Sequence, residues 1–221
     1  GWMSAQSAAG TTDMKDFTSV PGRLCFSMGP LEYLRPFVAP LFSWAAAVGP
    51  KGRVQLSWSI TFILEHLAAE LQGGGRVEAV RATAADIGLA FRADARAEDQ
   101  VVRVGGWECL NDGRPGSARW FAVDLNKKNA PWAFARGEPF RTIASLELYA
   151  TLLCVVLFGG RWPDGAKGTV RLQGVTDNLG NTFVLSKLMS SKFPLIVVLA
   201  ELSAQLRSRG MVLGLEWAPR D

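Results

Sequence analysis

The stretch "TIASLELYATLLCVVLFGG" (142–160) has the pattern of a buried helix with a charged residue inside its apolar face. Apolar residues recur every three or four positions, which predicts one face packed in the core; they are Ile143, Leu146, Ala150, Leu153, Cys154 and Leu157. Glu147 lies within this stripe. Because burying an unpaired carboxylate is costly, a protein cation, a hydrogen-bond network or a metal ion must compensate for it.

The composition is typical of a folded intracellular protein. Apolar residues make up 48% of the 221 residues and charged residues 20%. The net charge of +4 permits a polyanionic partner without requiring one. The three cysteines form no Cys-x-x-Cys pair, which favours reduced thiols in the cytoplasm or nucleus. No apolar run reaches the roughly 18–20 residues that cross a bilayer, and no signal-peptide pattern opens the chain, so we expect no membrane segment.

The chain divides into three regions by composition. Residues 1–20 are small and polar without a period, which predicts a disordered tail. Residues 21–75 have the pattern of a small helical segment. It ends at three consecutive glycines, 73–75, which mark the expected domain boundary. Residues 76–221 form the second expected domain.

Beyond that boundary the pattern predicts an α/β fold. Three strands come first, followed by a helix, a strand, one or two helices and a last strand. This order builds a mixed five-stranded sheet flanked by helices. The expected strands are 87–95, 101–109, 118–125, 168–178 and 211–217, and the expected helices are 142–158, 179–191 and 195–208.

Three carboxylates fall at related places in this fold. Asp94 is expected at the end of the first strand and Asp177 at the end of the fourth. If these strands are neighbours, the helix between them brings Glu147 toward both. Converging carboxylates repel one another unless divalent cations neutralise them, and an all-oxygen set favours Mg²⁺ or Mn²⁺.

Each carboxylate also has a simpler interpretation. Asp177 could cap a helix or form an Asx turn. Asp94 could be a solvated charge at a strand end. Glu147 could pair with Arg141.

The ordered set resembles the ribonuclease H domain attached to retroelement reverse transcriptases. That family has an Asp on the first strand, glycine on the second, a Glu in the first helix and an Asp ending the fourth strand. The matching segments here are "FRADARA" (91–97), "VGGWE" (104–108), "IASLELYA" (143–150) and "VTDNLGN" (175–181). The closing "LEWAPRD" (215–221) resembles the strand and loop that precede the family's fourth carboxylate.

The earlier segment "PGRLCFSMGPLEYLRPFVAPLFSW" (21–44) resembles the connection between polymerase and ribonuclease H in DIRS-like retroelements. The two resemblances imply a ribonuclease H-like fold preceded by a helical connection segment, within a polyprotein that also carries a polymerase domain. The fourth carboxylate would follow Asp221, so the ribonuclease domain is expected to be truncated at its C-terminus.

The activity implied by the resemblance is hydrolysis of the RNA strand of RNA–DNA hybrids. Asp94, Glu147 and Asp177 would be the catalytic residues and would hold two Mg²⁺ or Mn²⁺ ions. The alternative is a non-catalytic domain, derived from a retroelement, that packs on a polymerase or binds nucleic acid.

Contacts to the nucleic acid are expected from polar side chains near the site. The candidates are Lys127, Lys128, Asn178, Lys187 and Lys192. Surface lysines are often only solvated, which is the alternative for each. The strand tryptophans Trp107, Trp120 and Trp217 are expected in the core, whereas Trp132 is the one candidate for an exposed loop.

Overall fold

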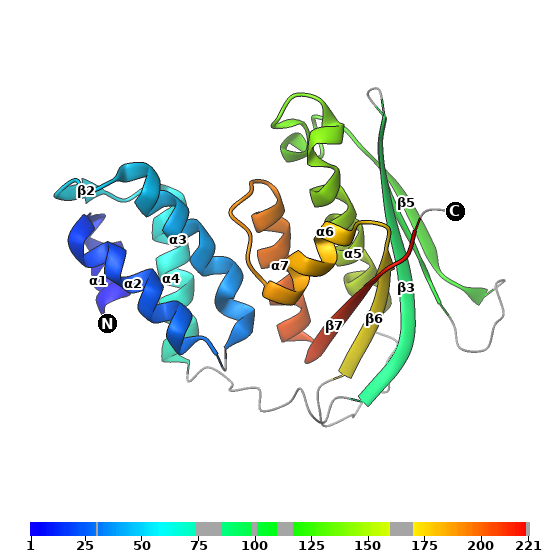
Figure 1. Ribbon diagram of the computed structural model, residues 1–221, viewed down its shortest axis with the longest axis horizontal. Helices are drawn as coiled ribbons and strands as arrows, with labels where there is room; N and C mark the ends of the chain where they lie inside the picture. Colours follow the sequence, from blue (N-terminus) through cyan, green and yellow to red (C-terminus); the bar gives the residue numbers. More distant parts are fainter. Residues whose placement is uncertain (30, 74–84, 99–100, 110–116, 160–169, 220–221) are drawn as a thin grey trace. The chain divides into compact units, whose positions relative to one another are not determined.

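The computed structural model describes residues 1–29, 31–73, 85–98, 101–109, 117–159 and 170–219. The chain forms two compact units, Gly1–Ala79 and Val80–Asp221 (Figure 1). The predicted boundary at 75/76 and the predicted turn "LNDGRPG" (110–116) lie outside the described residues.

The first unit is a small helical bundle with a two-stranded antiparallel ribbon. Its core is made by apolar side chains from the helices, including Phe17, Leu41 and Leu64. The elements are α1 (Trp2–Ala9), β1 (Thr11–Asp13), α2 (Met14–Ser27), η1 (Glu32–Leu34), α3 (Arg35–Val48), β2 (Arg53–Gln55) and α4 (Trp58–Gln72), with β1 paired to β2.

The expectation of a disordered tail over residues 1–20 is wrong. Met14 and Phe17 are fully buried, and the Phe17 ring lies 4.8 Å from that of Trp44. The Asp13 side chain accepts a hydrogen bond from the Lys15 amide and so begins α2. The buried residues Met14, Phe17 and Pro21 recur at helical spacing. The many small residues around them make this pattern hard to recognise in the sequence.

The second unit confirms the predicted α/β class, the mixed five-stranded sheet and the order of elements. Its elements are β3 (Ala85–Glu98), β4 (Val101–Glu108), β5 (Trp120–Leu125), η3 (Pro131–Phe134), η4 (Pro139–Thr142), α5 (Ile143–Phe158), β6 (Val170–Thr176), α6 (Leu179–Lys187), α7 (Leu195–Ser208) and β7 (Met211–Trp217). The strand order is β5-β4-β3-β6-β7. The first and fourth strands, β3 and β6, are therefore parallel neighbours, which is the condition that the predicted carboxylate site required.

Helices α5, α6 and α7 lie on one face of this sheet (Figure 1). No described helix covers the opposite face of β3, β4 and β5. Trp107 and Trp120 lie directly opposite each other on β4 and β5 and are 46% and 75% exposed. Trp217 is 50% exposed. The expectation that these three rings are core residues is wrong. Trp107 and Trp120 lie on the open face of the sheet, and Trp217 is the last residue of the edge strand β7.

Helix α5 is the central element of the helical layer. Cys154 lies 3.8 Å from the Arg92 carbonyl oxygen of β3, and the Phe158 ring lies 6.0 Å from that of Phe121 on β5. At the end of α5, Arg119 donates to the carbonyl of Leu157 and pairs with Glu108, which is 6% exposed. These contacts fix the height of α5 over the sheet.

The sequence predicted no membrane span, but one described helix is long and apolar enough for one by length and composition. It comprises Pro139–Phe158 and has a mean hydropathy of 1.6. Of its most apolar 18-residue stretch, 56% is buried inside the structure. Because it packs on β3, β4 and α7, we interpret it as the core helix of the second unit.

The three free thiols provide a test of this packing. Cys154 is fully buried, whereas Cys25 and Cys109 are partly exposed. Burial raises the pKa of all three thiols, most strongly that of Cys154, and so lowers their thiolate fraction. With Ellman's reagent at pH 8 we expect two thiols to react slowly in the folded protein, and the third only after denaturation. Equal reactivity of all three would contradict the position of α5.

Candidate functional site

The pairing of β3 with β6 ends before the carboxylates. The last parallel pair is Arg92 with Val175. Strand β3 then continues to Glu98, paired only with β4 on its other side. Asp94 and Asp177 each lie two residues beyond that last pair, so their backbones are level at the carboxyl edge of the sheet. Ligands of open α/β sheets bind outside the carboxyl ends of the strands.

The structure corrects the expected position of Asp94. It does not end its strand, because β3 runs four residues further to Glu98. Ala93 and Ala95 are buried on the face that carries α5, whereas the side chain of Asp94 is exposed on the open face. One of its oxygens accepts a hydrogen bond of 2.8 Å from the Ala95 amide.

Glu147 approaches the same level from the helical layer. It is 5% exposed and lies seven residues before Cys154, on the stripe of α5 that faces the sheet. Seven residues of helix rise about 10 Å, the length of about three strand residues. Since α5 runs antiparallel to β3 and Cys154 contacts Arg92, Glu147 is level with about Ala95. The expectation that this carboxylate is inside is confirmed.

Main-chain contacts fix the loop around Asp177. Trp217 donates its indole N–H to the Asp177 carbonyl at 3.0 Å. The N-cap of α6 is Asn178, whose side chain accepts a hydrogen bond from the Asn181 amide at 3.2 Å. The capping role considered for Asp177 therefore belongs to its neighbour. Asp177 itself is half-buried, and its Oδ1 is fully buried.

Asn181 was not among the residues predicted from the sequence. It is 1% exposed, and its amide nitrogen donates to the Ala144 carbonyl in the first turn of α5 at 2.9 Å. Its side-chain oxygen is buried and accepts no hydrogen bond within the described residues. This bond ties the start of α6 to the start of α5, one helical turn before Glu147. Asp177 and Glu147 are thereby held at the same edge of the sheet.

The three predicted carboxylates are level, but they do not form one cluster. Asp177 and Glu147 belong to the loop and helix that Asn181 joins, and Asp94 lies on the open face of the neighbouring strand. Within the described ranges, no three His, Cys, Asp or Glu side chains are close enough to hold a metal ion together. The donor chemistry, all carboxylate oxygen, suits Mg²⁺.

The predicted nucleic-acid contacts are distributed over two regions. Lys127 and Lys128 are exposed in the turn after β5, at the same carboxyl edge as Asp94 and Asp177. Lys187 ends α6, nine residues and about 13 Å of helix from Asn178. Lys192 is exposed in the loop that follows. The first pair is therefore the better placed to contact a substrate at this edge.

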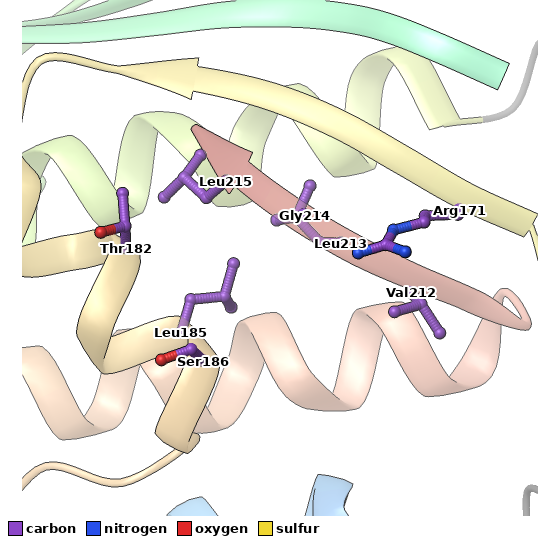
Figure 2. A pocket seen from close by; sticks show the side chains of 8 residues that line it. All are labelled: Arg171, Thr182, Leu185, Ser186, Val212, Leu213, Gly214 and Leu215. Carbon is purple, nitrogen blue, oxygen red and sulfur yellow. The ribbon is translucent and has the colours of Figure 1, made fainter. Parts of the chain in front are cut away.

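A cavity of about 350 Å³ lies between β7 and α6 (Figure 2). Its lining includes Arg171, Leu185 and Gly214, and none of the described residues that line it carries a carboxylate. This cavity therefore lacks the donors of the predicted metal chemistry.

Comparison of the chain with models of known protein families gave no match, and comparison with curated proteins gave no significant match.

Proposed function

We propose that residues 80–221 are a ribonuclease H-type domain that hydrolyses the RNA strand of RNA–DNA hybrids. The observation that carries the proposal is the alignment of three acidic residues at the end of the β3–β6 pairing. Asp94 and Asp177 are level on parallel neighbours, and the buried Glu147 is at the same height on the helix between them. The same residues, in the same order, carry the resemblance to reverse-transcriptase ribonuclease H.

By the resemblance, Asp94, Glu147 and Asp177 would hold Mg²⁺ or Mn²⁺, two ions in the proposed reaction, which requires the Asp94 side chain to turn from the open face toward the other two carboxylates. When bound, the metal lowers the pKa of a water and stabilises charge on the leaving oxygen. The residues of the chain bind the hybrid and orient its scissile phosphate. Asn181 keeps α5 and α6 together, and Lys127 and Lys128 contact the backbone at the same edge of the sheet. A polymerase domain in the same polyprotein would deliver the hybrid.

The second candidate is a non-catalytic domain that packs on a polymerase or binds nucleic acid. It is favoured by the position of Asp94 on the open face and by the absence of a three-carboxylate cluster among the described residues. The two candidates differ in metal binding and in cleavage, which separates them experimentally.

The test uses a hybrid with a 5′-labelled RNA strand, incubated with Mg²⁺ or Mn²⁺ and either this chain or a chain extended beyond Asp221. We expect metal-dependent cleavage that EDTA stops, with double-stranded RNA and RNA-free DNA left intact. Calorimetric titration should also show binding of Mn²⁺. Hybrid binding without cleavage by either protein in either metal would favour the non-catalytic candidate.

A further inference from the structure

A second cavity in the Val80–Asp221 unit is distinct from the carboxylate edge in its chemistry. It has a volume of about 280 Å³ and a mostly apolar lining. The walls come from α5, α7, the η3 turn and the residues before α7. They include Trp132, Tyr149, Leu152, Phe193, Val197 and Glu201.

Two of the aromatic walls are held nearly at right angles. The rings of Trp132 and Tyr149 are 5.3 Å apart, with an angle of 73° between their planes. The turn that carries Trp132 is anchored by the buried Thr142 hydroxyl, which lies 2.7 Å from the Ala133 carbonyl oxygen. Because Tyr149 is part of the central helix α5, both rings have fixed positions.

The remaining walls add an exposed ring and one charge. Phe193 is half exposed at the rim, where Val197 is also exposed. Glu201 is the only charged residue among the described residues of the lining. Its Oε1 accepts a hydrogen bond of 2.8 Å from the side-chain amide of Gln205, one turn further along α7, which orients the carboxylate.

We propose that this cavity binds an organic cation: a methylated ammonium or a guanidinium group. Aromatic rings attract a cation through their negatively charged faces, and the attraction is strongest where water is excluded. A single carboxylate at the rim adds charge complementarity. The Glu201 carboxylate would repel an anion. It would add no electrostatic attraction to the binding of a neutral apolar group. The proposal does not depend on the proposed nuclease activity.

The experiment compares choline with 3,3-dimethyl-1-butanol, which has the same shape but no charge. In equilibrium dialysis and saturation-transfer NMR with the full chain, we expect choline to bind about tenfold more tightly than the alcohol. Two further pairs distinguish the source of the cation: the amide of acetyl-trimethyllysine against that of acetyl-norleucine, and acetyl-argininamide against acetyl-citrullinamide. A preference for any of the three cations over its neutral partner supports the proposal, and the tightest cation identifies the source.

Substitutions locate the binding. Glu201→Gln keeps the acceptor for Gln205 but removes the charge, and we expect it to weaken binding of the cation about three- to fivefold. Tyr149→Leu should weaken it about fivefold or more. The matched controls Glu216→Gln and Phe183→Leu change a carboxylate and a ring outside the lining, and should leave binding unchanged. Equal binding of cation and neutral partner, loss in the controls, or no binding to the folded protein would overturn the proposal.

Discussion

Asp177→Asn is expected to lower the rate of RNA cleavage from the hybrid by about 10²- to 10⁴-fold, because removing a charged metal ligand forfeits several kcal/mol of transition-state stabilisation. The substitution preserves the size of the side chain. It also preserves the hydrogen bond from Trp217, which goes to the main-chain carbonyl of residue 177. Mn²⁺ affinity, measured by calorimetry, should fall at least about tenfold. Asp94→Asn should have the same two effects, because the proposed reaction uses Asp94 as a ligand beside Asp177; unchanged cleavage in Asp94→Asn alone would mean that this side chain stays on the open face.

The matched control is Asp124→Asn. Asp124 is also an exposed strand carboxylate of this sheet, and it pairs with Arg103 through both oxygens, at 2.6 and 2.9 Å. The hydrogen bond from Arg103 lowers the pKa of Asp124. Because exposed ion pairs contribute little to stability, cleavage should remain within about twofold of the unmodified protein. A similar loss in Asp177→Asn and Asp124→Asn would show a general electrostatic effect, and unchanged cleavage in Asp177→Asn would contradict the proposed site.

The sequence predicted those parts of the fold in which local pattern and tertiary packing agree. The helix around Glu147 was found because its apolar residues recur at helical spacing, and Glu147 itself was found because a charge interrupts that pattern. The mixed five-stranded sheet followed from the order of elements, whereas the adjacency of β3 and β6 was only a condition of the predicted site. Strand β7 was predicted at its observed bounds, because Gly210 separates the helical apolar pattern before it from the strand pattern after it.

The remaining differences arise where the deciding contact is distant in the chain. Asp94 was placed at a strand end because the alanines around it give a weak alternation, and the extension of β3 depends on pairing with β4. Trp107 and Trp120 were expected in the core because they are large apolar rings on strands. Their exposure depends on how many layers cover the sheet, which the local sequence does not specify. Asn181 has no distinctive local pattern. Its role depends on the hydrogen bond that its side-chain amide donates to Ala144 of α5, which lies 37 residues earlier in the chain.

Gly106→Ala is expected to destabilise the second unit by about 2–3 kcal/mol, because overpacking a well-filled core costs that much. A Cβ at Gly106 would overlap the Cys154 sulfur and lie 3.0 Å from both the Arg92 carbonyl oxygen and the Phe121 ring. The contact partners are a backbone oxygen, the fully buried Cys154 sulfur and the half-buried Phe121 ring, which packs against Phe158, so none yields easily. Hydrogen exchange of the α5 amides in increasing urea measures the free energy of unfolding of this unit separately.

The neighbouring residue Gly105 provides the control for this prediction. A Cβ at Gly105 would contact only the Phe121 carbonyl oxygen, at 3.3 Å, on the open face of the sheet. Gly105→Ala should therefore cost less than about 1 kcal/mol. Adding Cys154→Ala to Gly106→Ala should recover part of the loss, with a coupling of about 1 kcal/mol. Equal effects of the two glycine substitutions would contradict the close approach of α5 to β4. Because that approach sets the height of Glu147 over the sheet, Gly106→Ala should also weaken Mn²⁺ binding.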